Sequence, residues 1–183
     1  MSKRKTAPPS DLGIGTALAS PVDAPAGINL DQNATTRPRA SVVAAGRDAM
    51  VETWHNPSSV HRAGQAARRT VELARADIAA LLGVKPRELT FTGGGTESVD
   101  LALRGGLAAR RRPILLTDDI EHAAVRDLAE ALERDGGIEV RRMPIGAGGV
   151  VDLDAARGML DETVGVMSLQ WANNETGALQ PVE

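Results

Sequence analysis

The chain contains no cysteine and no tyrosine, and its aromatic residues are one Phe and two Trp among 183 residues. Without cysteine, the chain itself supplies no disulfide, no thiolate metal ligand and no cysteine nucleophile, and we predict no metal site. The shortage of aromatic side chains means that Ala, Val, Leu, Ile and Met must build the core. The balance of 42% hydrophobic and 25% charged residues is nevertheless that of a globular protein.

A strong net charge and long apolar runs are also missing. The net charge of −3 gives no electrostatic basis for binding nucleic acid or an anionic membrane surface. No apolar run approaches membrane-spanning length, and the basic residues Lys3, Arg4 and Lys5 precede no apolar signal segment. We therefore expect no nucleic-acid partner and no membrane partner, with the cytoplasm as the default location.

The chain changes character after its first segment. Residues 1–27 are rich in Pro, Ser, Ala and Gly without apolar periodicity, which predicts a disordered leader. Residues 28–183 are long enough for a domain with a sizeable core. They begin with a predicted helix from Arg37–Pro38 to about Trp54, a polar loop over His55–His61, and a strongly periodic helix over Gly64–Leu82.

The segment Leu89–Asp100 organises the rest of the chain. Leu89–Thr92 has the pattern of a buried strand and runs into three glycines, Gly93–Gly95, followed by a helix that opens with Thr96 and Ser98. A glycine turn at a helix N-terminus offers unpaired N–H groups and a positive dipole end, so it suits a phosphate. The same pattern also fits an ordinary strand-to-helix turn, and it lacks the lysine and the spacing of nucleotide-binding loops.

Strands and helices alternate through the remaining residues. Strands are predicted at residues 113–117, 138–143 and 163–169, the last as a buried strand with helices on both faces, and helices at 122–133 and from Asp152 or Asp154 to Leu160. The helix after the glycine turn is expected to end at Gly105–Gly106. This order predicts an α/β fold with a mostly parallel sheet.

Ligands of such sheets lie at the carboxyl ends of the strands, and polar residues gather at three of these ends. The segments are Gly93–Ser98, Asp118–His122 and Asn173–Gly177. His122 fits either a helix cap or an imidazole that faces an anion and moves protons. The amides of Asn173 and Asn174 fit either the bonding of a loop backbone or donation to a ligand hydroxyl.

Five segments in this order resemble the pyridoxal-phosphate-dependent cysteine desulfurases of the class V aminotransferase family, in the branch that serves iron–sulfur cluster assembly and nitrogen fixation. They are Leu30–Thr36, Asn56–His61, Phe91–Ser98, Glu121–His122 and Asn173–Gly177. The resemblance implies the N-terminal part of a fold-type-I large domain over residues 28–183, with L-cysteine as substrate, an iron–sulfur scaffold protein as sulfur acceptor, and a homodimer.

Residue by residue, the resemblance gives Gly95 and Thr96 the role of holding the cofactor phosphate. His122 matches the histidine that stacks on the pyridine ring and transfers protons, so it is the one catalytic candidate. Asn174 matches the asparagine that bonds the phenolic oxygen. Many relatives have Ser where Gly93 stands and Ala where Gly95 stands, which leaves the backbone donors in place.

The family also needs a Schiff-base Lys, an Asp on the pyridine nitrogen, a catalytic Cys and an Arg for the substrate carboxylate, and in family order all four follow Asn174. The only lysines here are Lys3, Lys5 and Lys85, none of them at the family's position. We therefore expect an N-terminal fragment that is inactive alone, binds pyridoxal phosphate weakly or not at all, and leaves Leu89–Thr92 without its neighbouring strand. The alternatives are another class V enzyme, such as a selenocysteine lyase or an aminotransferase, and a non-catalytic module that pairs with an intact relative.

Overall fold

The computed structural model describes residues 28–182, so the predicted leader over residues 1–27 lies outside the described residues. By its internal contacts the chain forms two units, residues 1–72 and 73–183, and the boundary falls within one helix, α2 (Arg62–Leu82). None of the helices within residues 28–182 combines the length and the apolar character needed to span a bilayer.

The described part of the first unit is helical, as predicted. It contains α1 (Ala40–Glu52) and the first half of α2. The loop between them is tied to α2, because Nδ1 of His61 accepts a hydrogen bond from the Gly64 N–H at 3.2 Å. A Cβ on Gly64 would lie 2.6 Å from Cβ of Ser59, so only glycine lets the loop and helix approach this closely. No residue of α1 is buried.

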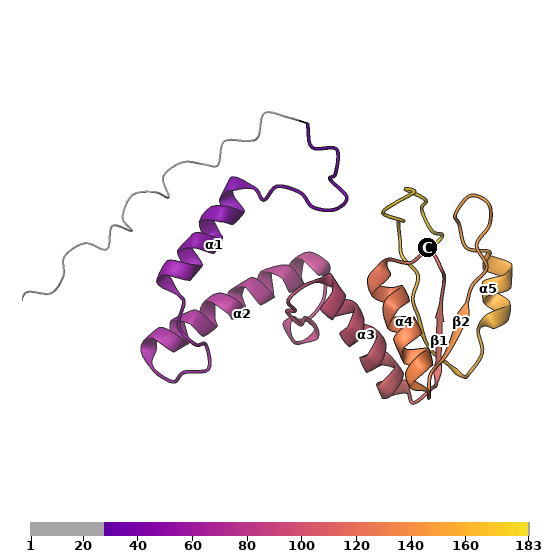
Figure 1. Cartoon of the computed structure of the whole chain (residues 1–183). Coiled ribbons are helices and arrows are strands. Elements are labelled where there is room, and N and C mark those ends of the chain that lie inside the picture. The colour runs from indigo at the N-terminus through magenta and orange to yellow at the C-terminus, as the bar shows by residue number, and fades with distance from the viewer. Residues whose placement is uncertain (1–27, 183) are drawn as a thin grey trace, which may run out of the picture. The chain divides into compact units, whose positions relative to one another are not determined.

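The second unit is built on a parallel sheet (Figure 1). Its strands are β1 (Ile114–Thr117), β2 (Glu139–Arg142) and β3 (Val164–Met167), in the order β2-β1-β3. Helices α3 (Gly95–Arg110), α4 (Ala123–Asp135) and α5 (Leu153–Met159) alternate with them. The predicted α/β fold with a parallel sheet flanked by helices is therefore confirmed.

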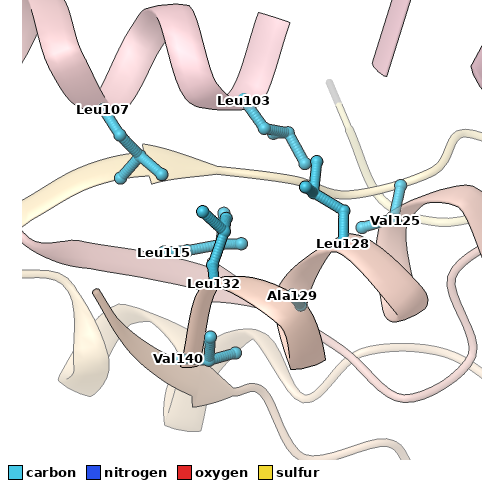
Figure 2. Packing of buried hydrophobic residues seen from close by; sticks show 8 residues of the cluster. All are labelled: Leu103, Leu107, Leu115, Val125, Leu128, Ala129, Leu132 and Val140. Atoms are coloured by element: carbon cyan, nitrogen blue, oxygen red, sulfur yellow. The ribbon is translucent and has the colours of Figure 1, made fainter. Parts of the chain in front are cut away.

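Two apolar clusters lie on the two faces of the central strand, because neighbouring residues of a strand point to opposite faces. Leu115 faces the larger cluster, which α3 and α4 complete (Figure 2). Leu116 faces the smaller one, which α5 covers together with Met143 and Val151. Both leucines are fully buried, so β1 is the centre of the fold. The larger cluster consists of Leu103, Leu107, Leu115, Val125, Leu128, Ala129, Leu132 and Val140.

The prediction that the third helix ends at Gly105–Gly106 is wrong, because α3 continues to Arg110. Burying Leu103 and Leu107 outweighs the cost of about 1 kcal/mol that each helical glycine carries. Gly106 also has a packing role, since a Cβ there would lie 2.7 Å from Cγ2 of Val166 on β3. The third strand lies at the sheet edge and is only half-buried, so the prediction of a strand buried on both faces is also wrong.

Leu89–Thr92 forms no strand, which corrects a further prediction. The segment follows a short 3₁₀ helix, η1 (Pro86–Glu88), and leads into α3 without a ladder of hydrogen bonds. It is held instead by Arg75, whose Nη1 donates to the Leu89 carbonyl at 2.5 Å and whose guanidinium lies 4.8 Å from the centre of the Phe91 ring. Within residues 28–182 no strand lies beside this segment to pair with it, so its extended backbone is not recruited into the sheet.

Candidate functional site

The candidate site lies at the carboxyl end of the sheet. The β1 chain leaves the sheet at Thr117 and enters α4 at Ala123. Helix α3 precedes β1 by a short connection and runs back antiparallel to it, so its N-terminus points toward the same end of the sheet (Figure 1). Two helix N-termini with their positive dipole ends therefore serve this edge, where ligands of α/β sheets bind.

The N-terminus of α3 is open. Gly94 is the cap residue and makes no side-chain capping bond, so the first N–H groups of the helix, from Gly95 and Thr96, are left for another acceptor. No heavy atom lies within 4 Å of the position that a Cβ would take on Gly94 or Gly95, so a ligand can reach the backbone. These features fit an anion such as a phosphate ester.

One acidic side chain already uses part of this turn. Oε2 of Glu97 accepts a hydrogen bond from the Gly93 N–H at 2.5 Å, which puts a carboxylate in the first turn of α3. The hydroxyl groups of Thr92 and Ser98 are 2.7 Å apart, and each donates to the Gly94 carbonyl at 3.1 Å. Ser98 thus holds the shape of the turn, and the N–H groups of the exposed residues Gly95 and Thr96 remain as donors for a ligand.

His122 is the cap residue of α4. Its Nδ1 accepts a hydrogen bond from the Ala124 N–H at 3.1 Å, and the ring is exposed. The capping role considered from the sequence is therefore confirmed. Since Nδ1 is the acceptor, a neutral imidazole carries its proton on Nε2 and can donate from there.

The two asparagines that follow β3 differ sharply. Asn173 is 6% exposed, donates from Nδ2 to the Ile120 carbonyl at 2.8 Å, and accepts from the N–H groups of Glu175 and Thr176 at 2.9 and 2.8 Å. Asn174 is exposed, and its Nδ2 donates to Oε1 of Glu175 at 2.9 Å. Asn173 therefore holds the loop, while the amide of Asn174 lies at the surface.

Two further bonds join the loops that follow β1 and β3. Ser168 donates from Oγ to Oε1 of Glu121 at 2.8 Å, and Nε2 of Gln170 donates to the Ile120 carbonyl at 2.7 Å. Because Glu121 immediately precedes His122, these bonds fix the backbone that carries the imidazole. We call Ile120, Glu121, Ser168, Gln170 and Asn173 the loop junction.

Two carboxyl groups at this edge have perturbed pKa values. Burial is the main cause that raises the pKa of Glu121, although the hydrogen bond from Ser168 acts in the opposite direction. Burial likewise raises the pKa of Asp118, against hydrogen bonds from the backbone of Ile120 and Glu121. Oδ2 of Asp118 and Oγ1 of Thr117 are buried without a hydrogen-bond partner among the described residues. Charge on either carboxylate is therefore costly here.

Of the three predicted polar segments, two are joined directly. The loop junction brings Asp118–His122 and Asn173–Gly177 together. Within the described part of the chain, no hydrogen bond joins Gly93–Ser98 to either of them. That segment is anchored instead through Val99 and Leu103 of α3. Ser168 and Gln170 had no role in the sequence-based prediction, and Glu121 entered it only as part of the Glu121–His122 motif, without its supporting role. Their one signal in the sequence is that they follow the apolar runs of β1 and β3.

Comparison with known proteins gives a consistent result. Residues 28–183 match the family described as Aminotransferase class-V. The chain is 43% identical over 159 residues to a protein named cysteine desulfurase from Cereibacter sphaeroides. The matched region covers 85% of this chain and 41% of that relative. It is 40% identical over 160 residues to an IscS-like cysteine desulfurase of Mycobacterium tuberculosis. This match covers 84% of this chain and 40% of that relative.

Solved structures give the same result for the fold. A NifS-like protein superposes with a TM-score of 0.78 at 36% identity, over 83% of this chain and 42% of that one. SspA in complex with cysteine superposes with a TM-score of 0.75 at 30% identity, over 84% of this chain and 44% of that one. The chain thus spans about two-fifths of the length of the relatives it matches. With its family matched from residue 28 onward, the chain belongs to the class-V aminotransferases and is homologous to an N-terminal portion of the cysteine desulfurases.

Proposed function

We propose that this chain is the N-terminal, cofactor-phosphate-binding part of a pyridoxal-phosphate-dependent cysteine desulfurase. The observation that carries the proposal is the open N-terminus of α3, which lies at the same sheet end as the exposed imidazole of His122. The homology to cysteine desulfurases over residues 28–183 supports it. The relatives release alanine from L-cysteine and pass the sulfur, as a persulfide, to an acceptor protein; in this proposal that activity belongs to the completed enzyme.

The residues present fit the cofactor. The N–H groups of Gly95 and Thr96 and the Thr96 hydroxyl would hold the phosphate, with the helix dipole favouring its negative charge. The exposed ring of His122 would lie against the pyridine ring, and the surface amide of Asn174 would donate to the phenolic oxygen. When bound, pyridoxal phosphate supplies an electron sink for the substrate carbon.

The chain's own contribution to the chemistry is positioning and proton transfer. With Nδ1 held by the Ala124 N–H, His122 presents Nε2 as the atom that gives or takes a proton. The loop junction fixes the backbone that leads into this residue. The Schiff-base lysine, the catalytic cysteine, the aspartate for the ring nitrogen and the arginine for the substrate carboxylate have no counterpart in residues 28–183, so the second part of the proposal is that this chain alone does not turn over cysteine.

Complementation tests both parts. The chain is co-expressed with the remaining three-fifths of the Cereibacter sphaeroides relative, and alanine release from L-cysteine and the visible absorbance of bound cofactor are measured. The completed pair is expected to bind cofactor and release alanine, and the 183-residue chain alone to release none. His122→Ala should lower kcat of the pair by at least about 100-fold. His55→Ala, which changes a half-buried histidine outside the candidate site, serves as the control. A pair that folds but neither binds cofactor nor releases alanine would refute the proposal.

A further inference from the structure

A groove lies at the opposite end of the sheet from the candidate cofactor site. It has a volume of about 410 Å³ and lies between the C-terminal half of α3 and the end of α4, where the chain enters β1 and β2. Its apolar floor is formed by Leu107, Leu132 and Ile138. The groove and the candidate cofactor site lie at opposite ends of the parallel strands. A ligand bound in the groove would therefore leave the cofactor site at the carboxyl ends accessible.

The groove carries charge of one sign. Arg104, Arg111 and Arg112 line it, and no aspartate or glutamate is among its lining residues. Arg104 is paired with Asp100 at 2.8 Å, whereas Arg111 and Arg112 take part in no ion pair within residues 28–182. On a chain whose net charge is −3, this is a local excess of positive charge beside an apolar surface.

Arg111 occupies a position that favours another residue. It ends α3 in the left-handed conformation, with φ of 53° and ψ of 34°, and is the non-glycine residue with positive φ in the described part of the chain. Glycine is the favoured residue at such a helix end, since a side chain there crowds the backbone. Arg110, in the last turn, already complements the negative end of the helix dipole. Arg111 ends the helix through its backbone, so its guanidinium is not needed for that role.

We propose that this groove, which we call the arginine groove, binds an acidic segment of a partner protein. One or two apolar side chains of the segment would cover the floor, and its carboxylates would pair with Arg111 and Arg112. Guanidinium groups bind carboxylates through two parallel hydrogen bonds, which gives both strength and direction. The groove is open to solvent rather than enclosed, which suits an extended segment. No aromatic residue lines it for stacking on bases, which favours a peptide over a nucleic acid.

The test measures binding of a fluorescent peptide to the full 183-residue chain by anisotropy. The peptide carries a central Leu-Leu pair with three acidic residues on each side. Compared peptides replace the acidic residues by lysine or the leucines by serine. The wild-type chain is expected to bind the acidic peptide, to bind the leucine-free peptide more weakly, and not to bind the lysine peptide. Raising the salt concentration to about 0.5 M should weaken binding, because exposed charge pairs are screened.

The variants separate binding from folding. The double change Arg111→Gln and Arg112→Gln should weaken binding about tenfold. Its charge-matched control changes Arg87 and Arg157, two exposed arginines outside the groove, and should leave binding unchanged. Arg111→Gly relieves the left-handed backbone, so it should raise the melting temperature and still weaken binding. The proposal is overturned if the wild-type chain does not bind the acidic peptide, or if the control pair weakens binding as much as the groove pair.

Discussion

Replacing Asn173 by alanine should destabilise the second unit, whereas the same change at Asn174 should hardly affect its stability. Asn173 is 6% exposed and joins the loop after β1 to the loop after β3. The substitution removes the bond to the Ile120 carbonyl and three bonds that its Oδ1 accepts, from the two N–H groups of Glu175 and Thr176 and from the Thr176 hydroxyl at 3.2 Å. A single hydrogen bond contributes about 0.5–1.5 kcal/mol net.

The surroundings decide how much of that sum is lost. The Ile120 carbonyl keeps its bond from Gln170 at 2.7 Å, and the N–H groups of Glu175 and Thr176 lie in an exposed turn where water can replace the amide. We therefore expect Asn173→Ala to lower the free energy of unfolding by about 2–3 kcal/mol, less than the sum of four full bonds. For a chain of this size that corresponds to a fall of ~1 M in the urea midpoint.

Urea unfolding followed by far-ultraviolet circular dichroism measures both variants. Asn174→Ala removes an exposed amide, so its effect should stay below about 0.5 kcal/mol. In the complemented enzyme Asn174 is the proposed cofactor ligand. Asn174→Ala should therefore weaken cofactor binding there, although it hardly changes stability. The reasoning fails if Asn174→Ala costs as much stability as Asn173→Ala, or if Asn173→Ala costs less than about 0.5 kcal/mol.

Three further predictions concern the second unit. Gly106→Ala should lower the free energy of unfolding, measured in urea, by about 1–3 kcal/mol, because its Cβ would lie 2.7 Å from Cγ2 of Val166. Gly105→Ala has open space around its Cβ and should raise the free energy of unfolding by up to about 1 kcal/mol. Equal effects of the two changes would contradict the close packing at Gly106. Burial raises the pKa of Glu121 above 4.5, so the folded state holds that proton more tightly than the unfolded state. The contribution of Glu121 to the free energy of unfolding should therefore be complete below pH 4.5 and be lost as the pH rises through the raised pKa. Glu121→Gln should flatten this part of the pH profile, and an unchanged profile would contradict the raised pKa. In hydrogen exchange the amides of Leu89–Thr92 should exchange faster than those of Leu115 and Leu116, and strong protection at Leu89–Thr92 would show a pairing that the fold lacks.

Periodicity predicted the helices and the three strands of the sheet well. The stripe of apolar residues in Gly64–Leu82 and the apolar runs at β1 and β3 are local signals, and they appear as α2, β1 and β3. Two of the three errors arose from rules that packing overrides. Gly105–Gly106 does not end α3, because Leu107 is buried beyond it, and Leu89–Thr92 is strand-like in sequence but has no strand beside it to bond with.

The candidate site shows the same division. The glycine turn and the positions of His122 and Asn174 after their strands are visible in the sequence, and the motifs placed them in a family that the comparisons confirm. Which asparagine is buried, and that Glu121 and Ser168 bond across 47 residues of chain, is not visible there. The roles of Gly95, Thr96, His122 and Asn174 toward the cofactor remain predictions.

By itself the sequence determined the order of elements, the α/β class and the family, because these follow from local patterns of apolar residues, glycines and short motifs. Only the tertiary structure decided which residues meet: Asn173 with Ile120, Gly106 with Val166, and three arginines around one apolar floor. These meetings depend on strand order and helix approach, which are set by the packing of side chains distant in the chain. No local pattern carries that information.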